Sequence, residues 1–156
     1  MENKEEKLVP IYIVRTLVFL FAIVVLTMIL LSASNYPVQW KQQINYERMR
    51  YLEVYVQALE YRYLDYNKVM PPLPETEKLI ANDDSCSVYC PALGRSVDCF
   101  NMTSVLVPGY MRELLRDPIV ESKHSSGFYI MQNENGFKVG SCFTYFGEDI
   151  SIEKEL

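Results

Sequence analysis

Glycine, histidine and basic charge are all scarce in this chain, and each shortage narrows what the chain can do. None of the six glycines precedes Gly94, and no Gly-rich phosphate-binding loop occurs. A single histidine, His124, leaves little choice for Ser–His or Cys–His catalysis. The formal net charge of −5 provides no basic face for nucleic acid. We therefore expect neither an enzyme nor a nucleic-acid-binding protein.

Charged residues are also missing from one long stretch near the N-terminus. No Asp, Glu, Lys or Arg occurs from Thr16 to Trp40, and this run is rich in Leu, Ile, Val and Phe. As a helix, Thr16–Ala33 would rise about 27 Å, close to the roughly 30 Å hydrocarbon core of a bilayer. Arg15 precedes the run and Tyr36 follows it, where snorkelling cations and interfacial aromatic residues are expected. The stretch therefore predicts one membrane-spanning helix.

Two features bear on processing and orientation. Ser32-Ala33-Ser34 resembles a signal-peptidase site, which leaves cleavage of the segment open as an alternative. However, the run is longer than a usual signal sequence, and acidic residues lie in the leader before it. All four cysteines follow the run, as in a domain that folds in an oxidising compartment. We therefore expect an uncleaved single-pass protein of the cell membrane, with a cytoplasmic N-terminus and an extracytoplasmic C-terminal domain.

The helical pattern continues beyond the apolar run. Neither glycine nor proline occurs from Val38 to Lys68, and apolar residues recur there at helical spacing. We expect near-continuous helix from Val14 to Lys68, with any bend at Pro37 and the end set by the prolines from Pro71 onward. The stripe would pack either on its own domain or on neighbouring subunits, and the sequence leaves both open. The candidate interaction residues on it are Ile44, Tyr51, Tyr55, Leu59 and Tyr63.

The rest of the chain predicts a small antiparallel sheet. Gly127–Gln132 and Phe137–Phe143 flank an Asn135-Gly136 pair, which is typical of a β-hairpin turn. A third short strand is expected over Asp149–Ile152, and a short helix over Val107–Arg116. Three short strands are too few to be stable alone, so the amphipathic helix should cover one face of the sheet.

The four cysteines predict disulfide bonds rather than a zinc site. Cys86, Cys90, Cys99 and Cys142 lack the paired C-x2-C spacing of structural zinc. Cys86 and Cys90 lie in Asn82–Asp98, which we expect to be an irregular loop, whereas Cys142 would be held in a strand. We expect Cys142 to be bonded to one of the other three, and the remaining two to each other. The sequence assigns no metal, cofactor or small-molecule ligand.

The order of landmarks along the chain resembles a known family. A hydrophobic helix runs into an amphipathic one and then into a small sheet, and Pro37 lies near the end of the apolar run. This layout is similar to that of type IV pilin-like proteins and the pseudopilins of type II secretion. The resemblance implies a pilin-like α+β fold and a non-enzymatic role in envelope, pilus or secretion-type assembly. The landmarks in the second half are Leu106–Met111, Asp117-Pro118, Gly127–Tyr129, Asn135–Val139 and Gly147–Ile150.

The chain departs from that family at the start of its apolar helix. Pilins and pseudopilins carry a prepilin-peptidase site of the form Gly-Phe-Thr-Leu-Ile-Glu, whereas this chain has Val14–Leu20, with neither the glycine nor the glutamate. The resemblance therefore implies an accessory or partner subunit that stays in the membrane rather than a major filament subunit.

The expected organisation has four parts. They are a cytoplasmic segment (1–15), a transmembrane helix (16–36), an amphipathic helix (37–70) and an extracytoplasmic, disulfide-bonded head with a β-hairpin (71–156). The expected partners are the lipid bilayer and other membrane or pilin-like subunits. An alternative from another class is an extracytoplasmic module that binds a peptide or glycan and is displayed on a membrane-anchored helical stalk.

Overall fold

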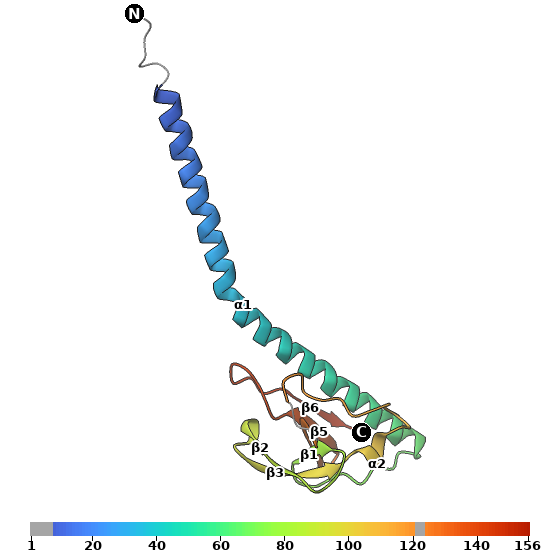
Figure 1. Ribbon diagram of the computed structural model, residues 1–156. Helices are drawn as coiled ribbons and strands as arrows, with labels where there is room; N and C mark the ends of the chain where they lie inside the picture. Colours follow the sequence, from blue (N-terminus) through green and yellow to red (C-terminus); the bar gives the residue numbers. More distant parts are fainter. Residues whose placement is uncertain (1–7, 121–123) are drawn as a thin grey trace, which may run out of the picture. The chain divides into compact units, whose positions relative to one another are not determined.

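The protein is α+β, with one long helix followed by a sheet (Figure 1). The computed structural model describes residues 8–120 and 124–156, without the side chains of 8–11, 34 and 35, so the expected segment 1–15 lies partly outside the described residues. The described chain forms two compact units that divide between Trp40 and Lys41. The elements are α1 (Leu8–Asp65), β1 (Lys78–Ala81), β2 (Ser87–Cys90), a 3-10 turn (Pro91–Leu93), β3 (Arg95–Asn101), α2 (Thr103–Leu106), β4 (Ser125–Asn133), β5 (Gly136–Ser141) and β6 (Ser151–Glu155).

Helix α1 confirms the near-continuous helix that the sequence predicts, with Pro37 inside it. Its end differs from the prediction, because the helix closes at Asp65 rather than at the prolines. The amide of Lys68 donates to the carbonyl of Tyr63 at 2.9 Å, and Asn67 has a φ of 53°. This is the Schellman closure, in which a left-handed residue ends a helix and satisfies its last carbonyl groups. The prolines follow in the connection to β1.

The sheet has six strands in the order β2-β3-β1-β4-β5-β6, which is twice the number that the sequence predicts. It is mixed rather than antiparallel, since β1 and β3 run parallel while every other neighbouring pair runs antiparallel. The expected irregular loop over Asn82–Asp98 is therefore wrong in part, because it contains β2 and the start of β3. Strand β1 escaped prediction because it lies between β3 and β4 with Leu79, Ile80 and Ala81 all buried, which removes the polar–apolar alternation.

Each face of the sheet carries its own apolar core. The second half of α1 lies along one face (Figure 1). There Leu52, Tyr55 and Leu59 pack with Phe128 and Val139. This confirms that the amphipathic helix covers the sheet. The opposite face holds a second cluster: Leu79, Ala81, Cys90, Val97, Cys99, Tyr129 and Cys142. The strands alternate between the two clusters residue by residue, as the pleat requires.

The expected hairpin is present, but Gly136 has a different role from the one predicted. Asn133 of β4 pairs with Gly136 of β5, so the turn consists of Glu134 and Asn135, and Gly136 is already a strand residue. A Cβ atom at position 136 would overlap the backbone carbonyl of Lys154 in β6. Glycine is needed here for the close approach of the next strand rather than for turn geometry.

The short helix in the middle of the head lies before the one that the sequence predicts over Val107–Arg116. Helix α2 occupies Thr103–Leu106, and Val107 is extended rather than helical. Pro108 follows Val107, and a residue before proline is disfavoured in the helical region. At the start of this turn the side-chain oxygen of Asn101 accepts from the amide of Ser104 at 3.3 Å.

The cysteines form two disulfide bonds, Cys86–Cys99 and Cys90–Cys142. Cys142 is bonded to one of the other three and the remaining two to each other, as predicted. The Cα–Cα distances of 5.2 and 4.7 Å lie in the usual range. Both bonds belong to the face of the sheet that α1 does not cover. The first ties the turn after β1 to β3, and the second ties β2 to the residue that follows β5.

We predict that the Cys90–Cys142 bond stabilises the head more than the Cys86–Cys99 bond. It spans 52 residues against 13, which corresponds to about 4 against about 3 kcal/mol in the chain-entropy model. Pairwise replacement of each bond by serine, followed by chemical denaturation, measures the difference. Non-reducing peptide mapping should recover these two pairs. Any other pairing would contradict the register of β2 and β3.

Candidate functional site

The first part of α1 is apolar and exposed along its described length. Every described side chain from Tyr12 to Ala33 is exposed. Its most apolar 18-residue window has a mean hydropathy of 2.8, and none of that window is buried. By length and composition this is one helix that can cross a membrane. Tyr36 and Trp40, which follow the run, are also exposed.

The second part of α1 is fixed to the head by a buried arginine. Arg48 and Asp117 are both fully buried, and Arg48 Nε lies 2.6 Å from Asp117 Oδ2. A second nitrogen, Nη2, donates to Asp117 Oδ1 at 3.2 Å, which makes the pair bidentate. The third nitrogen, Nη1, donates to Asn45 Oδ1 at 3.0 Å. All three guanidinium nitrogens are therefore satisfied, as a buried charge requires.

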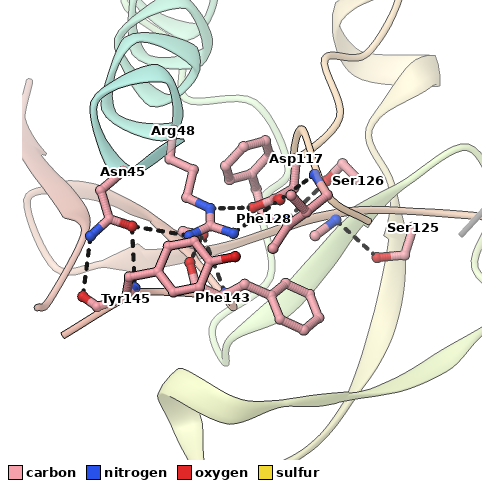
Figure 2. Close-up of polar contacts among 11 residues, drawn as sticks. Asn45, Arg48, Asp117, Ser125, Ser126, Phe128, Phe143 and Tyr145 are labelled. Atoms are coloured by element: carbon pink, nitrogen blue, oxygen red, sulfur yellow. Dashed lines mark hydrogen bonds and ion pairs between the residues drawn. The ribbon is translucent and has the colours of Figure 1, made fainter. Parts of the chain in front are cut away.

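Asn45 extends this cluster to the segment between β5 and β6. Its Nδ2 donates to the carbonyl of Tyr145 at 3.1 Å and to Glu148 Oε2 at 2.8 Å, while its Oδ1 accepts from the amide of Tyr145 at 3.2 Å. The Arg48 guanidinium lies 5.1 Å from the centre of the Tyr145 ring, a cation–π distance. Figure 2 shows Asn45 and Arg48 reaching from α1 toward Asp117 and Tyr145. The cluster joins three chain segments and positions them.

Asp117 is in turn fixed by its own backbone. Its amide donates to the carbonyl of Ser126 at 2.7 Å, and its Oδ1 accepts from the amide of Ile119 at 3.0 Å. A Cβ atom at Gly127 would approach the Cβ of Asp117 to 2.9 Å, and Gly127 has a φ of 82°. Glycine therefore allows the start of β4 to pass close beside the carboxylate.

Sequence reasoning missed this cluster, although a signal for it exists. Ile44, Arg48, Leu52, Tyr55 and Leu59 follow one another at spacings of three or four residues, so Arg48 lies in the middle of the apolar stripe. A charged residue on a buried helix face demands a buried partner. The pattern predicts that such a partner exists, but it cannot select Asp117 among the acidic residues of the head.

The five predicted interaction residues lie toward the head. Tyr55 and Leu59 are fully buried and Ile44 is nearly so, whereas Tyr51 and Tyr63 are half-buried. The rings of Tyr51 and Tyr55 contact Phe128 of β4 edge-on, with centroids 6.3 and 5.9 Å away. The predicted contact between these tyrosines and the sheet is confirmed. The exposed apolar residues of this part of α1 are different ones, and we refer to them as the outer stripe: Tyr46, Val54, Tyr61 and Leu64.

Three further polar side chains have partners within the head. Tyr55 donates its hydroxyl to the carbonyl of Leu115 at 2.7 Å, and burial raises the pKa of its phenol. His124 is exposed and lies 3.5 Å from Asp83. The hydroxyl of Ser85 donates to Asp83 and lowers the pKa of that carboxyl. Within residues 8–120 and 124–156, no group of three or more His, Cys, Asp or Glu side chains is arranged to hold a metal ion.

No protein-family model matches the chain, and no curated protein or solved structure is significantly similar to it.

We predict that Arg48→Met destabilises the head by about 3–5 kcal/mol, because it leaves the Asp117 carboxylate buried without its cation. Chemical denaturation of the full chain in detergent measures the change. The control is Arg50→Met, an exposed position on the same helix, which should change the stability by at most about 0.5 kcal/mol. The double variant Arg48→Met/Asp117→Leu should recover much of the loss, since it removes both charges. Equal effects at positions 48 and 50 would show that the pair is not buried.

We also predict that Tyr55 makes the head sensitive to alkali. Above about pH 10 a phenol ionises in the unfolded chain, whereas burial keeps Tyr55 protonated in the folded head. The folded state then binds more protons than the unfolded state, so the free energy of unfolding falls as the pH rises.

Tyr55→Phe removes this contribution and costs about 1 kcal/mol at neutral pH through the lost hydrogen bond to Leu115. Denaturation of both proteins near neutral pH and at about pH 11 tests it. The variant should lose less stability over this interval than the wild type. Tyr129, whose pKa burial raises to about 12, is present in both proteins and cancels. Parallel pH profiles would contradict the assignment.

Proposed function

We propose that this chain is a membrane-anchored, pilin-like subunit that acts through assembly with other membrane or envelope proteins and performs no catalysis. The observation that carries the proposal is the contrast within α1. Its residues from Thr16 to Ala33 carry no charge and are all exposed, whereas those from Ile44 to Leu59 include much of the apolar core of the head. So large an exposed apolar surface marks an interaction site, and its length matches a bilayer.

The two disulfide bonds of the head support one direction of insertion. Disulfides persist in extracytoplasmic compartments and are rare in reducing cytosol. We therefore place the head outside the cell membrane and the N-terminus in the cytoplasm. Arg15 then lies at the cytoplasmic end of the apolar run and Lys41 at the outer end, so each end carries a cation that can reach the headgroups.

The pilin-like part of the proposal is supported by layout. A long helix leaves an apolar segment and continues directly onto one face of a sheet, as the sequence resemblance implies. The mixed order of the six strands adds detail that this resemblance did not anticipate. Because the stretch Val14–Leu20 has neither the glycine nor the glutamate of the prepilin-peptidase site, we propose an accessory or partner subunit rather than a major filament subunit.

The outer stripe is the surface that we propose for neighbouring subunits. Tyr46, Val54, Tyr61 and Leu64 are separated by eight, seven and three residues, which places them on one side of the helix. They point away from the side that packs on the sheet, so a partner can contact them without disturbing the head. Tyrosine is enriched in protein interfaces because it offers a large apolar ring with a polar end.

We predict that a photo-cross-linking residue at Tyr61 captures membrane proteins in native membranes, while one at Arg95 captures none. Arg95 is the first residue of β3 and is exposed, and it does not belong to the apolar core that α1 forms with the sheet. Mass spectrometry of the cross-linked products identifies the partners. Alkaline extraction of the same membranes should leave the chain in the pellet. Equal labelling from both positions, or release of the chain by alkali, would contradict assembly through the outer stripe or anchoring by α1.

A second candidate function rests on a hollow at the end of α1. It has a volume of about 570 Å³ and is lined in part by Tyr61, Leu64, Lys68 and Lys154. Aromatic rings beside charged side chains suit a peptide or glycan ligand, which favours the binding-module alternative. The two functions separate experimentally. A head released near Trp40 would bind its ligand without detergent if it is a binding module, whereas an assembly subunit requires its membrane partners.

A further inference from the structure

The segment between β5 and β6 is held beside the part of α1 that immediately follows the apolar run. Asn45 bonds both the amide and the carbonyl of Tyr145, at 3.2 and 3.1 Å. Lys41 Nζ lies 5.4 Å from the centre of the Tyr145 ring. Lys41 is also the first charged residue after the uncharged stretch that ends at Trp40. The Tyr145 ring therefore lies beside the first charged residue that follows the apolar run.

The next residue, Phe146, projects an apolar ring at this level. Phe146 is 56% exposed, although its ring is large and wholly apolar. Its φ is 64°, a conformation that is rare for a bulky residue, and Gly147 follows with a φ of 68°. Such backbone persists where the surroundings hold it in place, and here Asn45 holds the neighbouring residue.

The length of the uncharged helix places this ring near the surface of a membrane. The uncharged stretch Thr16–Trp40 rises about 36 Å as a helix, which exceeds the roughly 30 Å hydrocarbon core and ends within the headgroup region of a bilayer about 40–45 Å thick. Lys41 then lies in the outer headgroup layer. Tyr145 contacts Lys41 and Asn45 within one compact unit, so its segment lies beside the residues of α1 that directly follow the apolar run.

We propose that Tyr145 and Phe146 form a second membrane contact, in which the Phe146 ring inserts into the outer headgroup region of the bilayer that α1 crosses. This inference rests on the proposed membrane anchoring. Aromatic residues are enriched at this depth of membrane proteins. Lys41 is offset by the exposed Glu148 and Asp149, so the contact depends on apolar insertion and not on anionic lipid. The contact fixes the head against the membrane surface and limits the orientations that α1 offers to partners.

The single tryptophan makes the test direct. The full chain is reconstituted in phosphatidylcholine vesicles that contain brominated phosphatidylcholine, which quenches tryptophan by contact. Wild-type Trp40 reports whether α1 is inserted. The variant Trp40→Phe/Phe146→Trp reports the proposed contact, and Trp40→Phe/Tyr61→Trp is the matched control. Tyr61 is 63% exposed, similar to Phe146, but lies about 24 Å farther along the helix than Asn45.

We expect bromine near the headgroups to quench the tryptophan at position 146 to an extent comparable with Trp40, with a blue-shifted emission, and to leave position 61 unquenched. Quenching of Trp40 without any at position 146 would overturn the contact and leave the anchoring proposal intact. Equal quenching at positions 146 and 61 would also overturn it, since the whole helix would then lie on lipid. An unquenched Trp40 would overturn the proposed anchoring, and this contact with it.

Discussion

The buried pair of Arg48 and Asp117 determines how the helix sits on the sheet. Apolar packing alone is non-directional, and a stripe of similar residues tolerates displacement by a turn of helix. A fully buried guanidinium tolerates none, because moving it away from the carboxylate leaves two unpaired charges in the core. The pair therefore sets the register of α1 along the sheet. Asn45, which bonds the same guanidinium, transmits that register to the segment that carries Tyr145.

The two faces of the sheet are stabilised by different means, and the small size of the head explains why. On one face α1 supplies Leu52, Tyr55 and Leu59 to a continuous apolar core. No comparable helix covers the other face in the part of the chain that the structure describes. There both disulfide bonds belong to the cluster: Cys86–Cys99 ties the segment after β1 to β3, and Cys90–Cys142 ties β2 to the residue after β5. A domain of this size has little apolar surface to bury, and cross-links make up part of the difference.

Prediction from sequence succeeded where one periodic signal was decisive. The course of α1 follows from the absence of glycine and from its helical spacing, and the β4–β5 hairpin follows from two flanking apolar segments. It failed where position in the sheet removed the signal, as in the fully buried β1. It also failed where a residue serves a distant neighbour. Gly136 resembles a turn residue, yet the backbone of Lys154 is what requires it. Arg48 is visible as an anomaly in the stripe, but only the fold brings Asp117 to it.

Because α1 is one helix, the register set by Arg48 also determines what the helix presents on its other side. The residues that pack on the sheet and those of the outer stripe alternate along the same turns, so a rotation that buried Tyr61 would expose Leu59. The core of the head thereby selects which tyrosines α1 exposes. In a membrane-anchored chain the apolar segment holds this helix at one depth, and the proposed Phe146 contact restrains its rotation. When the depth, rotation and register of α1 are all fixed, the outer stripe is the surface that α1 presents to the proposed partner. Under the proposed function, the head acts through the position in which it holds α1.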